Sequence, residues 1–143
     1  MLDSSAIKSE AKKQTNLENF GNPLFLKGFE SLVQSINHEA DLNNIGLEAQ
    51  KHRLTGVLAN LLLIEEACIK HPEILNEEIN SPVVIVGLPR TGSTMTHRLL
   101  ASDPRHTAML WWEGRYPAML NDEIRGNPQE RIEMGKAEVE AVM

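Results

Sequence analysis

Hydrophobic residues recur at helical spacing through most of the first seventy positions. One apolar stripe runs between residues 23 and 40, and its members are Phe25, Phe29, Leu32, Ile36 and Ala40. A second stripe runs between residues 47 and 70, and its members are Leu54, Val57, Leu58, Leu61, Ile64 and Cys68. A return of apolar side chains every three or four residues is typical of one face of an α-helix. We therefore expect two amphipathic helices here, preceded at residues 1–21 by a polar stretch that forms a frayed tail or a weak helix.

The pattern changes after residue 80, where helical spacing gives way to a continuous apolar run. Residues 83–86 read Val-Val-Ile-Val, as expected of a parallel strand that is buried on both faces. A glycine-bracketed loop follows, and residues 92–102 then form a helix. Residues 107–112, TAMLWW, predict a second strand. It would lie parallel to the first, with the helix as a right-handed crossover.

These elements divide the chain into two parts. We expect an α-helical segment over residues 1–80 and an α/β domain over residues 81–143, with a last helix over residues 129–143. A doubly wound sheet usually has about five or six strands, so two strands amount to an incomplete parallel sheet.

The loop between strand and helix is the candidate site. The spacing from Gly87 to Gly92 matches the phosphate-binding P-loop, G-x-x-x-x-G-K-[ST], except that Ser93 stands at the lysine position. Arg90, inside the loop, is then the fixed cation. Free N–H groups at the start of the following helix favour an anion. This composition indicates an anion smaller than a nucleoside triphosphate, and a 5′-phosphosulfate fits it.

Charge and composition narrow the classes of function. The net charge of −6 argues against general affinity for nucleic acid. Residues 82–115 nevertheless hold four arginines against two acidic residues, a local net of +2 around the candidate loop. Apolar runs such as Leu61 to Ile64 are far shorter than the roughly 20 residues that span a bilayer. The single Cys68 excludes an intramolecular disulfide, so a reducing compartment is compatible with this chain. We therefore expect a cytoplasmic protein.

Several motifs in this region carry a family resemblance. They are GLPRTGST at residues 87–94, His97-Arg98-Leu99-Leu100, Asp103-Pro104, Trp112-Glu113 and Pro117. Together they resemble the sulfotransferases that use 3′-phosphoadenosine 5′-phosphosulfate (PAPS), and in particular a bacterial branch with a P-R-[ST]-G-[ST]-T loop. The resemblance implies a P-loop NTPase-like fold and transfer of the sulfuryl group of PAPS to the hydroxyl of a small-molecule or lipid acceptor.

The resemblance also assigns roles to individual residues. The cradle for the 5′-phosphosulfate would be formed by Thr91, Gly92, Ser93 and Thr94. Arg90 would neutralise the leaving phosphate, at a position where the family often has lysine. Glu113, which follows two tryptophans that could desolvate it, would be the general base, with His97 as the runner-up. Arg115 would contact the transfer site. Neither a metal ion nor a metal-ligand cluster is expected.

Two other interpretations remain open. The family binds the 3′-phosphate of PAPS through residues far beyond the loop, so the chain could be a non-catalytic or truncated fragment that binds PAPS or its product PAP. We expect residues 1–143 alone to be inactive in transfer for this reason. A P-loop nucleotide kinase is the other interpretation, and Ser93 in place of the lysine argues against it.

Overall fold

The computed structural model describes residues 1–120, 123–124 and 126–140. The chain separates into two compact units, residues 1–75 and 76–143. The elements of the first unit are α1 (Ser4–Thr15), α2 (Leu24–Glu39), α3 (Asn44–Lys70) and the 3₁₀ turn η1 (Pro72–Asn76), which crosses into the second. Those of the second are α4 (Ser93–Ala101), α5 (Trp111–Arg115) and α6 (Gln129–Glu140). No helix in the described part of the chain is long and apolar enough to cross a membrane.

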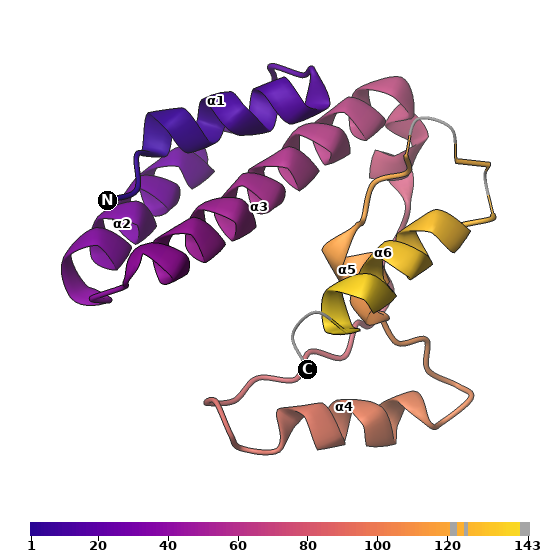
Figure 1. The fold of residues 1–143 in the computed structure, drawn as a ribbon. Coiled ribbons are helices and arrows are strands. Elements are labelled where there is room, and N and C mark those ends of the chain that lie inside the picture. The colour runs from indigo at the N-terminus through magenta and orange to yellow at the C-terminus, as the bar shows by residue number, and fades with distance from the viewer. Residues whose placement is uncertain (121–122, 125, 141–143) are drawn as a thin grey trace. The chain divides into compact units, whose positions relative to one another are not determined.

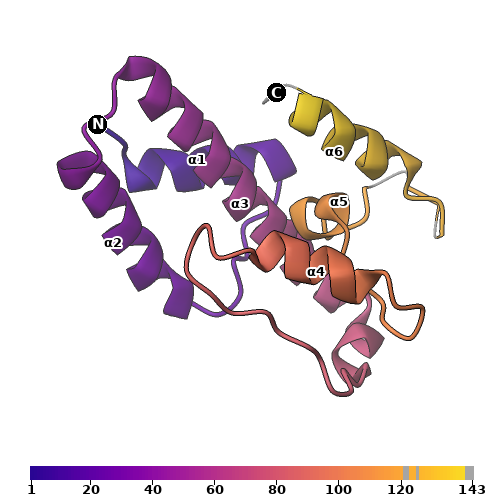
Figure 2. The ribbon, with the colours of Figure 1, turned by 90° about the horizontal axis from the view of Figure 1, so that it is seen from below.

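The first unit is a small bundle in which α1 packs against both α3 and α2 (Figure 1, and from below in Figure 2). Its buried core consists of Leu2, Ile7, Ala11, Phe29, Val33, Leu54, Leu58 and Leu62. The two helices predicted from the apolar stripes are confirmed, although α3 begins three residues before the predicted start. Asn43 explains this start, because its side-chain oxygen accepts a hydrogen bond from the Gly46 N–H at 2.9 Å and so caps the helix.

The sequence left open whether residues 1–21 form a frayed tail or a weak helix. The structure shows a helix, α1, that packs against the core. Asp3 caps it by accepting from the N–H groups of Ser5 (2.8 Å) and Ala6 (3.3 Å). The backbone of Leu2 is also held by Asn37 of α2, whose side chain accepts from the Leu2 N–H at 2.7 Å and donates to its carbonyl at 2.9 Å. These contacts order a segment whose own hydrophobic pattern is weak.

In the second unit, a polar cluster joins α6 to α5 and to the segment that follows α5. The Arg131 guanidinium of α6 pairs with Glu123 at 2.7 Å and donates to the Tyr116 carbonyl at 2.8 Å. It also lies over the Trp112 ring, 5.0 Å from the centroid. The two helices approach so closely that a Cβ at Gly135 would come within 2.8 Å of the Trp112 Cβ. A small residue is therefore required at position 135.

The strands predicted in this unit do not form within the described residues. Val83, Val84 and Val86 lie in an extended segment and are 64%, 75% and 88% exposed, so the predicted burial of residues 83–86 is wrong for this structure. The strand predicted over residues 107–112 is wrong at its end, because Trp111 and Trp112 begin α5. A strand is stabilised by a hydrogen-bonded neighbour. The described segments offer none, and the predicted parallel sheet is therefore not confirmed.

The later helices agree with expectation where the structure describes them. Residues 92–102 were predicted to be helical, and α4 spans Ser93–Ala101. The last helix begins at Gln129 as predicted and is described as far as Glu140, while the predicted residues 141–143 lie outside the described part of the chain.

The Arg131 cluster leads to a stability prediction. We expect Arg131→Met to lower the free energy of unfolding of the second unit by about 3 kcal/mol, because it leaves the carboxylate of Glu123, only 3% exposed, without its counter-charge. Both tryptophans of the chain lie in α5, so tryptophan fluorescence during urea unfolding reports on this unit. Lys136→Met, at an exposed position of the same helix, is the control and should change little. If both substitutions lower the free energy of unfolding equally, the Arg131 cluster does not stabilise the unit as proposed.

Candidate anion-binding site

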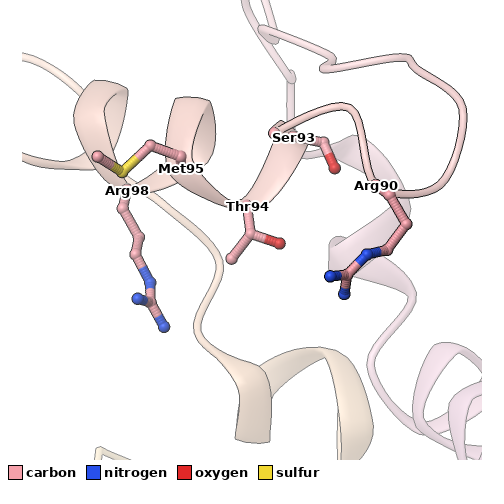
Figure 3. Close-up of a pocket in the computed structure, with 6 residues that line it drawn as sticks. Arg90, Ser93, Thr94, Met95 and Arg98 are labelled. Carbon is pink, nitrogen blue, oxygen red and sulfur yellow. The ribbon is translucent and has the colours of Figure 1, made fainter.

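A pocket of about 450 Å³ lies at the start of α4 (Figure 3). It is lined by Arg90, Gly92, Ser93, Thr94, Met95 and Arg98. All six residues come from one stretch of nine, so a single loop and the first turns of one helix form the pocket. This is the loop that the sequence identified as the candidate site.

Two features of the backbone set the shape of the loop. Arg90 has a φ of 69° and Gly92 a φ of 87°, both in the left-handed region. Glycine adopts this conformation freely, whereas a residue with a side chain rarely does. Pro89 precedes Arg90, and a proline followed by a residue with positive φ is the pattern of a type II turn. The turn thus holds the Arg90 side chain at the pocket in a conformation that the sequence pattern did not predict.

Thr91 closes the same turn. Its hydroxyl donates a hydrogen bond to the Leu88 carbonyl at 2.6 Å. A Cβ at Gly87 would lie 2.9 Å from this hydroxyl oxygen, so the close approach requires glycine. Gly87 is therefore needed because it has no side chain to clash with Thr91. Gly92 is needed because it adopts a positive φ.

The first N–H groups of α4 are available to a ligand. The Thr96 N–H donates to the Gly92 carbonyl at 3.0 Å and makes the first intrahelical hydrogen bond. Ser93, Thr94 and Met95 precede it, so their N–H groups have no intrahelical acceptor, and no side chain caps the helix. Free N–H groups and the positive end of the helix dipole together favour an anion at this place.

Two arginines add positive charge to the pocket. Arg90 and Arg98 extend on either side of Thr94 in Figure 3. Within the described part of the chain neither forms an ion pair with a carboxylate at 4.0 Å or less, although the protein carries a net charge of −6. The loop and helix start therefore present uncompensated positive charge to solvent.

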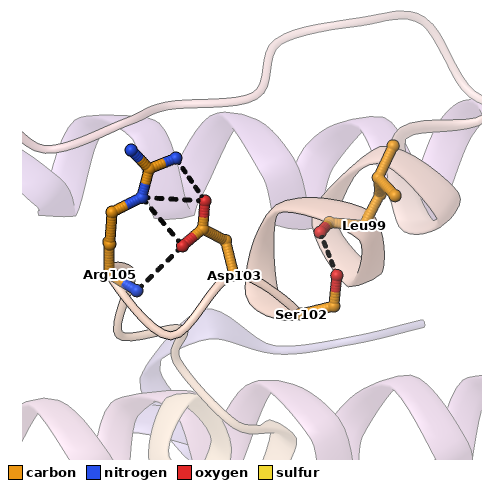
Figure 4. A network of polar contacts seen from close by, with 4 residues as sticks. All are labelled: Leu99, Ser102, Asp103 and Arg105. Carbon is orange, nitrogen blue, oxygen red and sulfur yellow. Dashed lines mark hydrogen bonds and ion pairs between the residues drawn. The ribbon is translucent and has the colours of Figure 1, made fainter.

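The other two arginines of this region are engaged elsewhere. Arg105 pairs with Asp103 at 2.6 Å (Figure 4), and its side-chain and backbone hydrogen bonds lower the pKa of Asp103 to about 2. Arg115 donates to Glu138 of α6 at 2.8 and 2.9 Å. Of the four arginines that give residues 82–115 their positive excess, Arg90 and Arg98 therefore line the pocket, and Arg105 and Arg115 are paired with carboxylates.

Of the predicted catalytic residues, Arg90 lines the pocket, whereas Glu113, Arg115 and the runner-up His97 lie outside its lining. Glu113 is in α5, where its Oε2 accepts a hydrogen bond from the Leu110 N–H at 2.6 Å and supports the start of the helix. Arg115 pairs with Glu138 as described above, and His97 is exposed on α4. The structure therefore gathers Arg90 with Gly92, Ser93 and Thr94 of the predicted cradle in one pocket. Thr91 is not among the lining residues, and its hydroxyl is used within the loop. The catalytic and binding roles of all these residues stay predictions.

The structure adds Met95 and Arg98 to the pocket, which the sequence analysis did not assign to it. A signal for Arg98 was present, because residues four apart lie on the same face of a helix, and Thr94 was already placed in the cradle.

Two comparisons with known proteins give a match. Residues 82–142 match the sulfotransferase family. The chain is similar to the crystal structure of sulfotransferase STF1 from Mycobacterium tuberculosis H37Rv, with a TM-score of 0.81 and 26% sequence identity. This similarity covers 98% of the present chain and 39% of that one, so the chain spans well under half of the length of STF1. A comparison with curated proteins gives no match.

Proposed function

We propose, from the premise that residues 82–142 belong to the sulfotransferase family, that the protein containing this chain transfers the sulfuryl group of PAPS to an acceptor hydroxyl. One observation carries the proposal for this chain. The pocket at the start of α4 combines free N–H groups with Arg90 and lacks the lysine with which a P-loop enzyme binds a triphosphate. Its donors are suited to the 5′-phosphosulfate end of PAPS.

The reaction needs little covalent participation by the protein. The hydroxyl oxygen of the acceptor bonds to sulfur while the bond from sulfur to the bridging oxygen breaks, and the 5′-phosphate leaves with the electron pair. Such a transfer resembles phosphoryl transfer with one less charge on the moving group, so positioning and charge stabilisation dominate. The N–H groups of Ser93 and Thr94 would hold the phosphate oxygens, and Arg90 would stabilise the charge that develops on the leaving oxygen.

The acceptor proton must go to a base, for which we propose Glu113. One carboxylate oxygen is held by the Leu110 N–H, and the other makes no hydrogen bond to the described residues. That second oxygen is the one that would take the proton. Arg115, proposed at the transfer site, would have to exchange its partner Glu138 for the substrate. His97 is the alternative base.

The acceptor and the cellular setting are part of the same proposal. The acceptor is a small molecule or a lipid that bears a hydroxyl group, and the reaction takes place in the cytoplasm. Catalysis proceeds without a metal ion, because one fixed cation and the helix N–H groups meet the lower charge of the phosphosulfate.

The choice of ligand tests the proposal. We expect isothermal titration calorimetry of residues 1–143 to show that PAP, the product of PAPS, binds without Mg²⁺ and more tightly than ATP does with Mg²⁺. The reason is that the loop carries Arg90 but has Ser93 where a kinase has its lysine. Binding of ATP that depends on Mg²⁺, together with no binding of PAP, would refute the sulfotransferase assignment and favour a nucleotide kinase.

A further inference from the structure

An ion pair joins the end of α5 to α6. Two hydrogen bonds leave from the Nε of Arg115 and reach the two carboxylate oxygens of Glu138 at 2.8 and 2.9 Å. The two side chains are 20% and 30% exposed, so solvent screens this pair less than a pair at a fully exposed position. Hydrogen bonds of this length between charged groups are among the stronger ones in proteins. The guanidinium of Arg115 is therefore bound to α6.

Tyr116 is a second partner of Glu138. Its hydroxyl donates a hydrogen bond to Oε2 of Glu138 at 3.4 Å, and its ring centre lies 5.7 Å from the guanidinium carbon of Arg115. Burial, followed by the negative charge of Glu138, raises the pKa of Tyr116, so the hydroxyl keeps its proton and remains a donor. Glu138 would keep this hydrogen bond if Arg115 moved away, and the cost of separating the ion pair is lower for that reason.

A carboxylate and a sulfuryl group bind a guanidinium through the same chemistry. Each presents partly or fully charged oxygens, and the planar set of N–H donors on arginine suits both. Arg115 is proposed to contact the transferred group, yet it does not line the pocket, and its guanidinium is bound to the carboxylate of Glu138. The transferred group must therefore compete with Glu138 for the same cation.

We propose that Glu138 competes with the sulfuryl group of PAPS for Arg115, and so lowers the affinity of the protein for PAPS relative to PAP, which has no sulfuryl group. This inference rests on the function proposed above and adds a residue that sets the discrimination between donor and product. Binding of PAPS must separate a partly exposed ion pair, which reduces its affinity by about fivefold. PAP does not need Arg115, so the pair stays intact when PAP binds.

The test compares two ligands that differ in the sulfuryl group. Calorimetry of residues 1–143, without an acceptor, measures the dissociation constants of PAPS and of PAP. Their ratio is the readout, because a change in the overall charge of the protein acts on both anionic ligands. Glu138→Gln removes the charge and keeps the size of the side chain, whereas Glu138→Asp keeps the charge and draws it back from Arg115. Glu130→Gln removes a charge from an exposed position of the same helix and is the matched control.

We expect Glu138→Gln to tighten the binding of PAPS about fivefold and to leave the binding of PAP unchanged. Glu138→Asp should shift the ratio in the same direction by a smaller factor, and Glu130→Gln should leave it unchanged. In a chain that already carries Arg115→Gln, the further change Glu138→Gln should have no effect on the ratio, because the cation for which the two groups compete is gone. Tryptophan fluorescence during thermal unfolding checks that each variant is folded.

Three results would overturn the inference. They are an unchanged ratio in Glu138→Gln, an equal effect of that substitution in the Arg115→Gln chain, and an equal effect of Glu130→Gln. In these cases PAPS and PAP still bind, and the proposed function stands. If Glu138→Gln does not fold, the ratio in Glu138→Asp decides by the same criteria. If neither ligand binds to any variant, the proposed function fails, and the inference fails with it.

Discussion

Arg90→Ala is expected to slow sulfuryl transfer by about 10²-fold or more, comparable to the loss of one donor from an oxyanion hole. The guanidinium lines the pocket at the start of α4, where it would face the charge that develops on the leaving phosphate. Thermal stability should barely change, because Arg90 is exposed and forms no ion pair with the described residues. The measurements are kcat and the unfolding temperature, both in the active protein that contains this chain.

Two companion substitutions sharpen this experiment. Arg90→Lys keeps a cation at the loop and should retain much of the rate, because the positive charge at the leaving phosphate is preserved. Arg53→Ala removes an exposed arginine from α3 and should leave kcat unchanged. If Arg90→Ala behaves like Arg53→Ala, Arg90 is a surface residue without a part in the reaction.

Glu113→Gln should reduce kcat by about 10²–10⁴-fold, the usual contribution of a general base. Glutamine keeps the shape of the side chain and retains an oxygen that can accept from the Leu110 N–H, so the start of α5 should survive. The affinity for PAP should also survive, because Glu113 does not line the pocket. Steady-state kinetics combined with calorimetric titration of PAP separates loss of turnover from loss of binding.

His97→Ala is the matched comparison for the base. It should leave most of the activity, since His97 is exposed on α4 and lies outside the pocket lining. If Glu113→Gln stays active while His97→Ala is inactive, the assignment of the base passes to His97. If both variants stay active, neither residue is the base.

The candidate site shows how far local sequence signals reach. The loop could be predicted from three local signals, because each constrains only its neighbours along the chain. They are two glycines five residues apart, an arginine between them and the start of a helix. The positive φ of Arg90 was missed, since the pattern shows a proline and an arginine but not the turn that they form. Arg98 was missed because a helix face becomes part of a site only when a pocket opens beside it.

Local signals also determined most of the helices. The apolar stripes predicted α2 and α3, and the glycine-bracketed loop predicted α4, because helical hydrogen bonds join residues only four apart. Strand formation depends on a neighbour that can lie anywhere in the sequence, and the β-branched run at residues 83–86 has none among the described segments.

The sequence by itself therefore determined the anion loop, the helix that carries it and the family resemblance. Only the tertiary structure decided that α1 is part of a core, that Arg115 pairs with a glutamate 23 residues away, and that Arg98 is left to face the pocket. The physical reason is that burial and ion pairing are contacts between distant parts of the chain, and their partners are chosen by packing rather than by spacing along the sequence.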